Sequence, residues 1–113
     1  MGKNWSWDQE KLEYKRLSAL YDEIPKNRRT VAEGLIRDAA RLKVSIDDLW
    51  EDIQKNGFTE FDPKFGKDRE RASATLFNTM EKSYRATLKH LDSLLPTEVE
   101  KKKRFSRLDD DDE

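Results

Sequence analysis

Six basic residues gather between positions 26 and 43, where only Glu33 and Asp38 oppose them, giving a local charge balance of +4. They are Lys26, Arg28, Arg29, Arg37, Arg41 and Lys43. Arg37 and Arg41 lie four residues apart, so a helix would place both side chains on one face. Such a face can neutralise nucleic-acid phosphates, each contact adding salt-sensitive affinity without sequence information. The alternative is an ordinary solvated helix face, since 42% of the chain is charged, and the sequence leaves both interpretations open.

Four acids lie close together in the sequence and could in principle hold a metal ion. They are Asp47, Asp48, Glu51 and Asp52. Helical spacing places them on the polar face, opposite Trp50 and Ile53. Magnesium demands a fixed arrangement of oxygen ligands, so we interpret the cluster as a solvated helix face and expect no metal site.

The chain carries no recognisable enzyme motif. It lacks a glycine-rich phosphate loop, paired zinc-binding histidines and a serine elbow, and it has no cysteine for thiolate chemistry. The only histidine, His90, stands between Lys89 and Leu91, and we interpret it as a surface residue rather than a general base. We therefore expect no catalytic residue, no cofactor and a protein that is not an enzyme.

The apolar pattern predicts an all-α fold with three short N-terminal helices and one long C-terminal helix. The expected helices span about 8–24, 28–43, 46–56 and 72–95. In the first, Tyr14, Leu17, Tyr21 and Ile24 follow helical spacing. Trp5 and Trp7 precede it, and either staple this helix or insert into a neighbouring molecule.

Local signals predict where the middle helices begin and end. Asn27 is expected to cap the second helix, and Gly34 to mark a close contact with another helix. A short break at Val44 and Ser45 separates the second helix from the third, which is compatible with a helix-turn-helix. Asn56 and Gly57 supply the stop of the third helix.

Residues 58–71 are expected to form an ordered aromatic connector. Phe58, Phe61 and Phe65 stand among glycines, a proline and charges, and aromatic side chains favour burial. A short hairpin is one form that this connector could take.

The long helix carries an apolar stripe and ends at Pro96. The stripe consists of Phe77, Met80, Tyr84, Leu88, Leu91 and Leu95. The 24 residues of this helix would extend roughly 36 Å, at about 1.5 Å per residue. The width of the stripe favours packing on two neighbours at once, and so an oligomer. The stripe either completes a core within the chain or forms contacts between subunits, and the sequence does not separate these alternatives.

The formal net charge of −1 conceals an uneven distribution. Residues 1–108 contain all 23 lysines and arginines and all but five of the 24 acids, a balance of +4, whereas residues 109–113 are entirely acidic. We expect residues 97–113 to form a mobile charged tail. The resulting division is an N-terminal helical region over 1–57 that holds the candidate DNA-binding residues, a connector over 58–71, the long helix over 72–96 and the tail. No apolar run approaches the length of a membrane span or a signal peptide, so we expect a soluble protein.

Two blocks of the chain resemble the small subunits of terminases from tailed phages of Gram-positive bacteria. The first joins Ile24-Pro25, the run Gly34-Leu-Ile-Arg-Asp-Ala-Ala-Arg-Leu-Lys-Val-Ser-Ile-Asp-Asp-Leu49 and Asn56-Gly57. The second is Leu76-Phe-Asn-Thr-Met-Glu-Lys-Ser-Tyr-Arg-Ala-Thr-Leu-Lys-His-Leu-Asp-Ser-Leu-Leu-Pro96. The resemblance covers about residues 20–96. Trp5, Trp7 and the aromatic connector lie outside the pattern.

The resemblance implies a non-catalytic factor of viral genome packaging in the host cell cytoplasm. Such proteins bind double-stranded viral DNA and deliver it to a large subunit that carries the ATPase and nuclease. They form rings, here expected to hold about eight to ten subunits, as head-to-tail contacts that close can do. On this basis the segment 26–43 is the expected DNA surface, the stripe the expected assembly surface and the tail the expected docking element for the large subunit.

Two other functions stay open at this point. One is a helix-turn-helix regulator, which would bind a short operator far more tightly than random DNA. The other is a protein-interaction adaptor that does not bind DNA.

Overall fold

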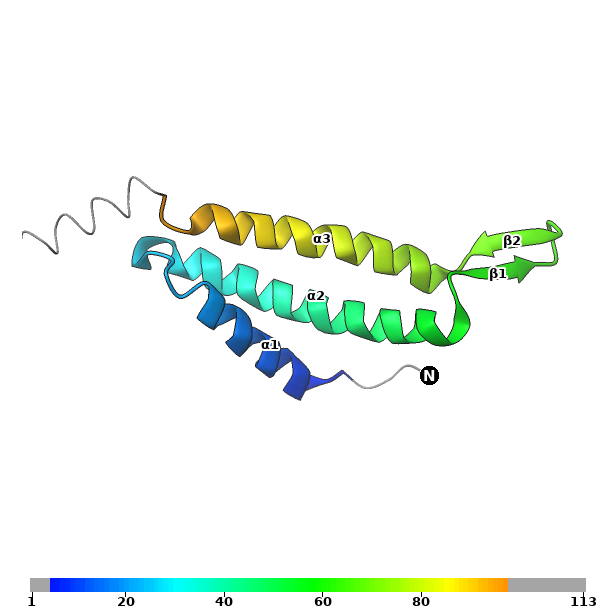
Figure 1. Cartoon of the computed structure of the whole chain (residues 1–113), viewed down its shortest axis with the longest axis horizontal. Helices are drawn as coiled ribbons and strands as arrows, with labels where there is room; N and C mark the ends of the chain where they lie inside the picture. The colour runs from blue at the N-terminus through cyan, green and yellow to red at the C-terminus, as the bar shows by residue number, and fades with distance from the viewer. Residues whose placement is uncertain (1–4, 98–113) are drawn as a thin grey trace, which may run out of the picture.

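A computed structural model describes residues 5–97 of the chain. It shows a mostly helical fold with one small antiparallel sheet (Figure 1). The elements are α1 (Trp7–Leu20), the 3-10 turn η1 (Lys26–Arg28), α2 (Arg29–Asn56), β1 (Thr59–Asp62), β2 (Lys67–Glu70) and α3 (Ala72–Leu94). The helical character matches the expectation, but the two strands mean that the fold is not strictly all-α. The charged tail expected over 97–113 lies outside the described residues, apart from Thr97.

Helices α2 and α3 lie side by side and antiparallel, with the β-hairpin projecting beyond one end of the pair (Figure 1). Helix α1 packs on the N-terminal half of α2, at the end away from the hairpin. At about 1.5 Å per residue, the 28 residues of α2 extend roughly 42 Å. None of the helices within residues 5–97 is long and apolar enough to cross a membrane.

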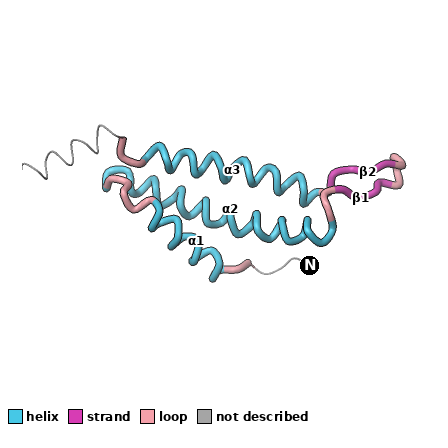
Figure 2. The backbone as a smooth tube through the Cα atoms, viewed as in Figure 1, coloured by secondary structure: helices cyan, strands magenta, loops and turns pink. Residues whose placement is uncertain are grey.

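The expected break at Val44 and Ser45 is wrong, because α2 runs through it without interruption (Figure 2). Val44 and Ile46 are both buried, so the apolar stripe that begins at Ile36 continues at helical spacing towards Ile53. No glycine or proline stands at this point to interrupt the backbone hydrogen bonds. Two of the expected short helices are therefore one long helix, and no helix-turn-helix forms here.

The ends of α1 are set by short-range signals. The Ser6 hydroxyl accepts a hydrogen bond from the Gln9 amide at 3.4 Å, and Asp8 and Glu10 occupy the first turn, where negative charge favours the helix dipole. The helix ends at Leu20, earlier than expected, and a turn carries the chain to Ile24.

Two expectations for α2 are corrected, and a third is confirmed. Asn27 does not cap the helix, because it lies inside η1 and no side chain caps the first turn. Gly34 marks no close contact, since a Cβ built there would meet nothing within 4 Å. Gly57 does end the helix: it adopts φ +82°, and its amide donates to the Ile53 carbonyl at 2.7 Å.

The core forms where α1 and α3 both meet the N-terminal half of α2. Its fully buried members are Leu17, Ile24, Ala32, Ile36, Ala39, Ala40 and Leu91. Three of these are alanines on α2, whose short side chains let neighbouring helices approach closely. Because α1, α2 and α3 all contribute side chains to this core, α3 packs in the same structural unit as α1 and α2.

Residues 58–71 form the hairpin that the sequence allowed, although for a different reason. Thr59 pairs with Glu70 and Asp62 with Lys67, and Gly66 takes φ +63° in the turn. The hairpin is not held together by burial of its aromatic side chains, because Phe61 and Phe65 are 63% and 66% exposed. Instead the strand ladder and turn shape the segment.

Candidate nucleic-acid interface

Two of the six expected DNA-binding cations hold the fold together. The Arg28 guanidinium donates to the Leu94 carbonyl at 3.1 Å, which fastens the end of α3 to the start of α2. Arg29 donates to the carbonyls of Asp22 and Ile24, at 3.3 and 3.2 Å, and so closes the turn after α1. These bonds satisfy carbonyls that would otherwise lack a donor.

Two more of the six are engaged in ion pairs. Arg41 Nε lies 2.9 Å from Oε1 of Glu10 and connects α2 to α1. Lys43 Nζ lies 3.0 Å from Oδ1 of Asp47 one turn along α2, and this hydrogen bond raises the pKa of Lys43. A phosphate would have to compete with these carboxylates for both cations.

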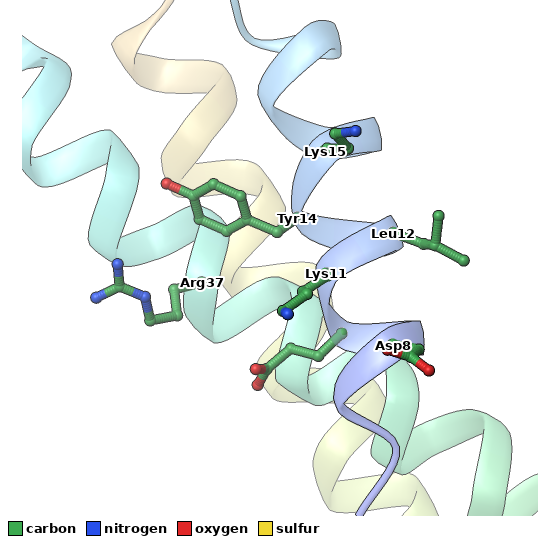
Figure 3. Close-up of a pocket in the computed structure, with 7 residues that line it drawn as sticks. Asp8, Lys11, Leu12, Tyr14, Lys15 and Arg37 are labelled. Carbon is green, nitrogen blue, oxygen red and sulfur yellow. The ribbon is translucent and has the colours of Figure 1, made fainter.

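Lys26 and Arg37 remain, and the side chain of neither forms a hydrogen bond or ion pair within residues 5–97. Arg37 lines an open groove of about 710 Å³ between α1 and α2 (Figure 3). Lys11 and Lys15 line the same groove from α1, one helical turn apart, and likewise have no polar partner in the described chain. Two helices thus bring three cations to one groove, which we call the cationic groove.

The acids and apolar groups of the cationic groove set its net charge and character. Glu10 lines it but is already paired with Arg41. Asp8 also lines it and offsets one of the three positive charges of Lys11, Lys15 and Arg37, so the groove keeps a smaller positive excess. Tyr14 and Leu12 contribute apolar surface from opposite sides of α1, Tyr14 on the side of α2 and Leu12 on the side away from it (Figure 3). The groove is open to solvent, so its charged groups are accessible from outside the molecule.

Lys11 and Lys15 were not among the residues expected from the sequence. Their spacing of four along a helix is the same signal that drew attention to Arg37 and Arg41. The spacing of Lys11 and Lys15 was overlooked because segment 26–43 carries more positive charge. The packing of α1 on α2 is what brings the two lysines to the same groove as Arg37.

Two acids of the acidic cluster on α2, Asp47 and Asp52, accept hydrogen bonds from side chains of the same chain. Asp52 accepts hydrogen bonds from Arg71 at 3.1 Å and from Asn56 at 2.9 Å, which joins α2 to the start of α3. Ser73, Asn56 and Arg71, in that order, lower the pKa of Asp52. The Ser73 hydroxyl is buried and makes no hydrogen bond in the structure, so the bonds from Asn56 and Arg71 are the firmer cause. Within residues 5–97, no three His, Asp or Glu side chains come together as a metal-ligand set.

The apolar stripe of α3 faces the rest of the chain more than it faces solvent. Leu91 is fully buried, and Tyr84, Leu88 and Leu95 pack against the core. Phe77 lies against Trp50, with ring centroids 5.6 Å apart. Met80 is half-buried. The side chain of Leu91 is therefore inaccessible to a second subunit.

A different apolar surface is exposed at the hairpin end of the molecule. It consists of Trp50, Phe58, Phe61 and Phe65, which are 43%, 51%, 63% and 66% exposed, and we call it the aromatic tip. Trp50 and Phe58 are in contact, with centroids 6.2 Å apart.

The known proteins offer no parallel: no family model, no curated protein and no solved structure matches the chain.

Proposed function

We propose that the chain is a non-catalytic DNA-packaging factor of the small-terminase type. It binds double-stranded viral DNA in the host cell cytoplasm and delivers the DNA to a large ATPase/nuclease subunit. The observation that carries the proposal is the cationic groove, where Lys11, Lys15 and Arg37 have no polar partner within residues 5–97. The resemblance over about residues 20–96 supplies the packaging role.

Whether a cation is already bonded within the chain affects how favourably it can bind a phosphate. A free cation exchanges water and counterions for phosphate, and counterion release favours binding. Arg41 would first have to leave Glu10, and Arg28 would have to leave the end of α3. DNA contacts therefore fall on Lys11, Lys15, Lys26 and Arg37 rather than on all six cations of segment 26–43.

Assembly into a ring is the second part of the proposal. The aromatic tip is supported as the assembly surface by its exposure, whereas most of the α3 stripe is used within the chain. Phe61 and Phe65 belong to the β-hairpin segment, which projects from the end of the α2/α3 pair away from α1 (Figure 1). A contact between two different patches on neighbouring copies is the kind that closes into a ring.

The DNA-binding proposal is tested by measuring the affinity for a short duplex at several salt concentrations. In the first variant, Lys11, Lys15 and Arg37 are each replaced by glutamine. If all three bind phosphates, the slope of log K against log salt becomes shallower by about 0.9 for each cation removed, about 2.7 in total. Affinity falls accordingly, and to the same extent for duplexes of unrelated sequence.

A matched control removes the same charge elsewhere. Lys55, Lys82 and Lys89 are exposed, and their side chains form no hydrogen bond or ion pair within residues 5–97. Replacing these three by glutamine should leave the slope close to that of the original chain. Equal effects in both variants would show a general influence of net charge and would contradict the assignment of the groove.

A protein-interaction adaptor is the second candidate, and the exposed aromatic tip favours it. An adaptor would show no salt-dependent DNA binding. If the original chain shows no binding to the DNA duplex at any salt concentration, the adaptor is favoured. The helix-turn-helix regulator has no local basis, since α2 is continuous at Val44 and Ser45. Preference for one short site over random DNA by a factor of roughly 10³–10⁷ would restore that alternative.

A further inference from the structure

We propose that the acidic segment at residues 109–113 docks in the cationic groove of its own chain and competes there with DNA. The docking is inferred from charge and reach alone. The competition rests, in addition, on the proposed DNA-binding function.

Charge complementarity is the first argument. Residues 109–113 are four aspartates and a glutamate, which form the strongest acidic run of the sequence. Among the described residues, the groove offers Lys11, Lys15 and Arg37 without polar partners, against Asp8 as the acid that Arg41 does not neutralise. A run of carboxylates can satisfy all three cations, as a DNA backbone would.

Reach is the second argument. The hydrogen bond from Arg28 to Leu94 places the end of α3 at the start of α2. Tyr21 Oη donates to Asp92 at 2.8 Å and brings the end of α1 to the same place. Along α2, Arg37 lies nine residues beyond Arg28, about 14 Å at 1.5 Å per residue.

The intervening chain is long enough to cover that distance. Twelve residue steps separate Thr97 from Asp109, and extended chain covers at most about 3.3–3.6 Å per residue, roughly 40 Å in total. The segment is therefore long enough for the acidic run to reach Arg37, Lys15 and Lys11 without any change in the helices.

A rival destination for the acids exists in the same segment. Residues 101–104 are three lysines and an arginine, and only four residues separate them from Asp109. The groove is favoured because its cations stand on two helices that are already packed together, so less backbone entropy is lost on binding there than in pairing two parts of one segment. The experiment must separate these two destinations.

Zero-length carbodiimide cross-linking of the full chain, without DNA and at low salt, tests the docking. The reagent joins a carboxylate to an amine in direct contact, and mass spectrometry of the digest identifies the pair. We expect links from residues 109–113 to Lys11 and Lys15 that disappear at high salt. Links confined to lysines 101–103, or spread equally over the exposed Lys82 and Lys89, would overturn the docking.

Mixing unlabelled with ¹⁵N-labelled chain decides which copy supplies the acids. Links within one isotopic species are expected. Links that join the two species would show that a neighbouring copy supplies them, and would overturn docking within the same chain.

The competition is tested with a full-length variant in which Asp109, Asp110, Asp111 and Asp112 become asparagine and Glu113 becomes glutamine. At low salt this variant should bind duplex DNA about fivefold more tightly or better, within the usual range of coupling between two sites. The increase in affinity should vanish when Lys11, Lys15 and Arg37 are already glutamine, which excludes long-range repulsion by the acidic segment as the cause.

The two failures are distinguishable. If neither chain binds DNA, the proposed function fails, while the cross-links still decide the docking. If the cross-links form and both chains bind DNA equally, the docking stands and the competition is wrong.

Discussion

At the scale of single residues, hydrogen bonds between distant positions decide what each charged or polar group can do. Arg28 belongs to segment 26–43 by sequence, yet it holds the end of α3. Tyr21 connects α1 to α3 through Asp92 at 2.8 Å. Partial burial, together with this bond, raises the pKa of Tyr21 to about 12.

The raised pKa of Tyr21 predicts a decrease of stability in alkali. In the unfolded chain the Tyr21 hydroxyl loses its proton near pH 10, whereas in the folded chain it keeps the proton up to about pH 12. The contribution of this proton to the free energy of unfolding is therefore fully present below pH 10 and is lost as the pH rises towards 12. Chemical denaturation at several pH values should show this decline. Tyr21→Phe should flatten it between pH 10 and 12 and cost about 1 kcal/mol at neutral pH, because the hydrogen bond to Asp92 is removed. An unchanged decline in Tyr21→Phe would assign it to another group, and Tyr14→Phe is the matched control.

At the scale of elements, the continuous α2 is the feature that positions the groove. Because α2 does not break at Val44 and Ser45, Arg37 and Arg41 lie on one continuous helix, and α1 packs against the N-terminal half of that helix. Glu10 on α1 meets Arg41, and Lys11 and Lys15 are thereby held beside Arg37.

Ser45→Ala distinguishes a continuous helix from a capped start by the sign of its effect. Inside a helix, alanine is favoured over serine, so the free energy of unfolding should rise by a few tenths of a kcal/mol. If Ser45 capped a separate helix, the same change would lower it by about 0.5–2 kcal/mol. Ser6→Ala is the control, since Ser6 is the observed N-cap of α1 and its removal should destabilise the protein. Urea titration of both variants measures the difference, and a destabilised Ser45→Ala would contradict the continuous helix.

At the scale of the whole molecule, the two ends of the elongated helix pair present different chemistry. The cationic groove lies towards one end, with α1, and the aromatic tip lies at the other (Figure 1). Under the proposed function, one end would bind DNA while the other would contact a neighbouring copy of the chain.

Replacing Phe61 and Phe65 by serine should reduce the mass of the assembly in solution. The original chain should form a stable multi-subunit particle whose mass persists at high salt, because apolar contacts are not screened. Native mass spectrometry or light scattering at two salt concentrations measures it. The control replaces Leu12 and Leu20 on α1, each 61% exposed, by serine. A monomer or dimer of the original chain at both salt concentrations would contradict the ring, and an unchanged mass in the Phe61/Phe65 variant would exclude the aromatic tip.

Much of the local structure is determined by the sequence alone. The spacing of Tyr14 and Leu17 predicted the inward face of α1, and Gly57 predicted the end of α2. The span of α3 also agrees, since 72–95 was expected and Ala72–Leu94 is observed. These features depend on helical periodicity and backbone conformation, which neighbouring residues specify.

Prediction from the sequence failed where a local signal was weak and packing decided. Ser45 resembles a helix cap, but burying Val44 and Ile46 on a continuous stripe stabilises the unbroken helix. Phe61 and Phe65 suggested burial, yet the hairpin extends past the ends of both helices, where no helix covers them.

Only the tertiary structure decided which charges are engaged within the fold. Glu10 is 31 residues from Arg41, and Leu94 is 66 residues from Arg28, so no local pattern links them. Folding engages these cations in bonds within the chain and brings Lys11, Lys15 and Arg37 together from two helices. The sequence determined that the protein is helical and densely charged, whereas the packing of α1 and α3 on α2 selected the charges and aromatic groups that remain available to a partner.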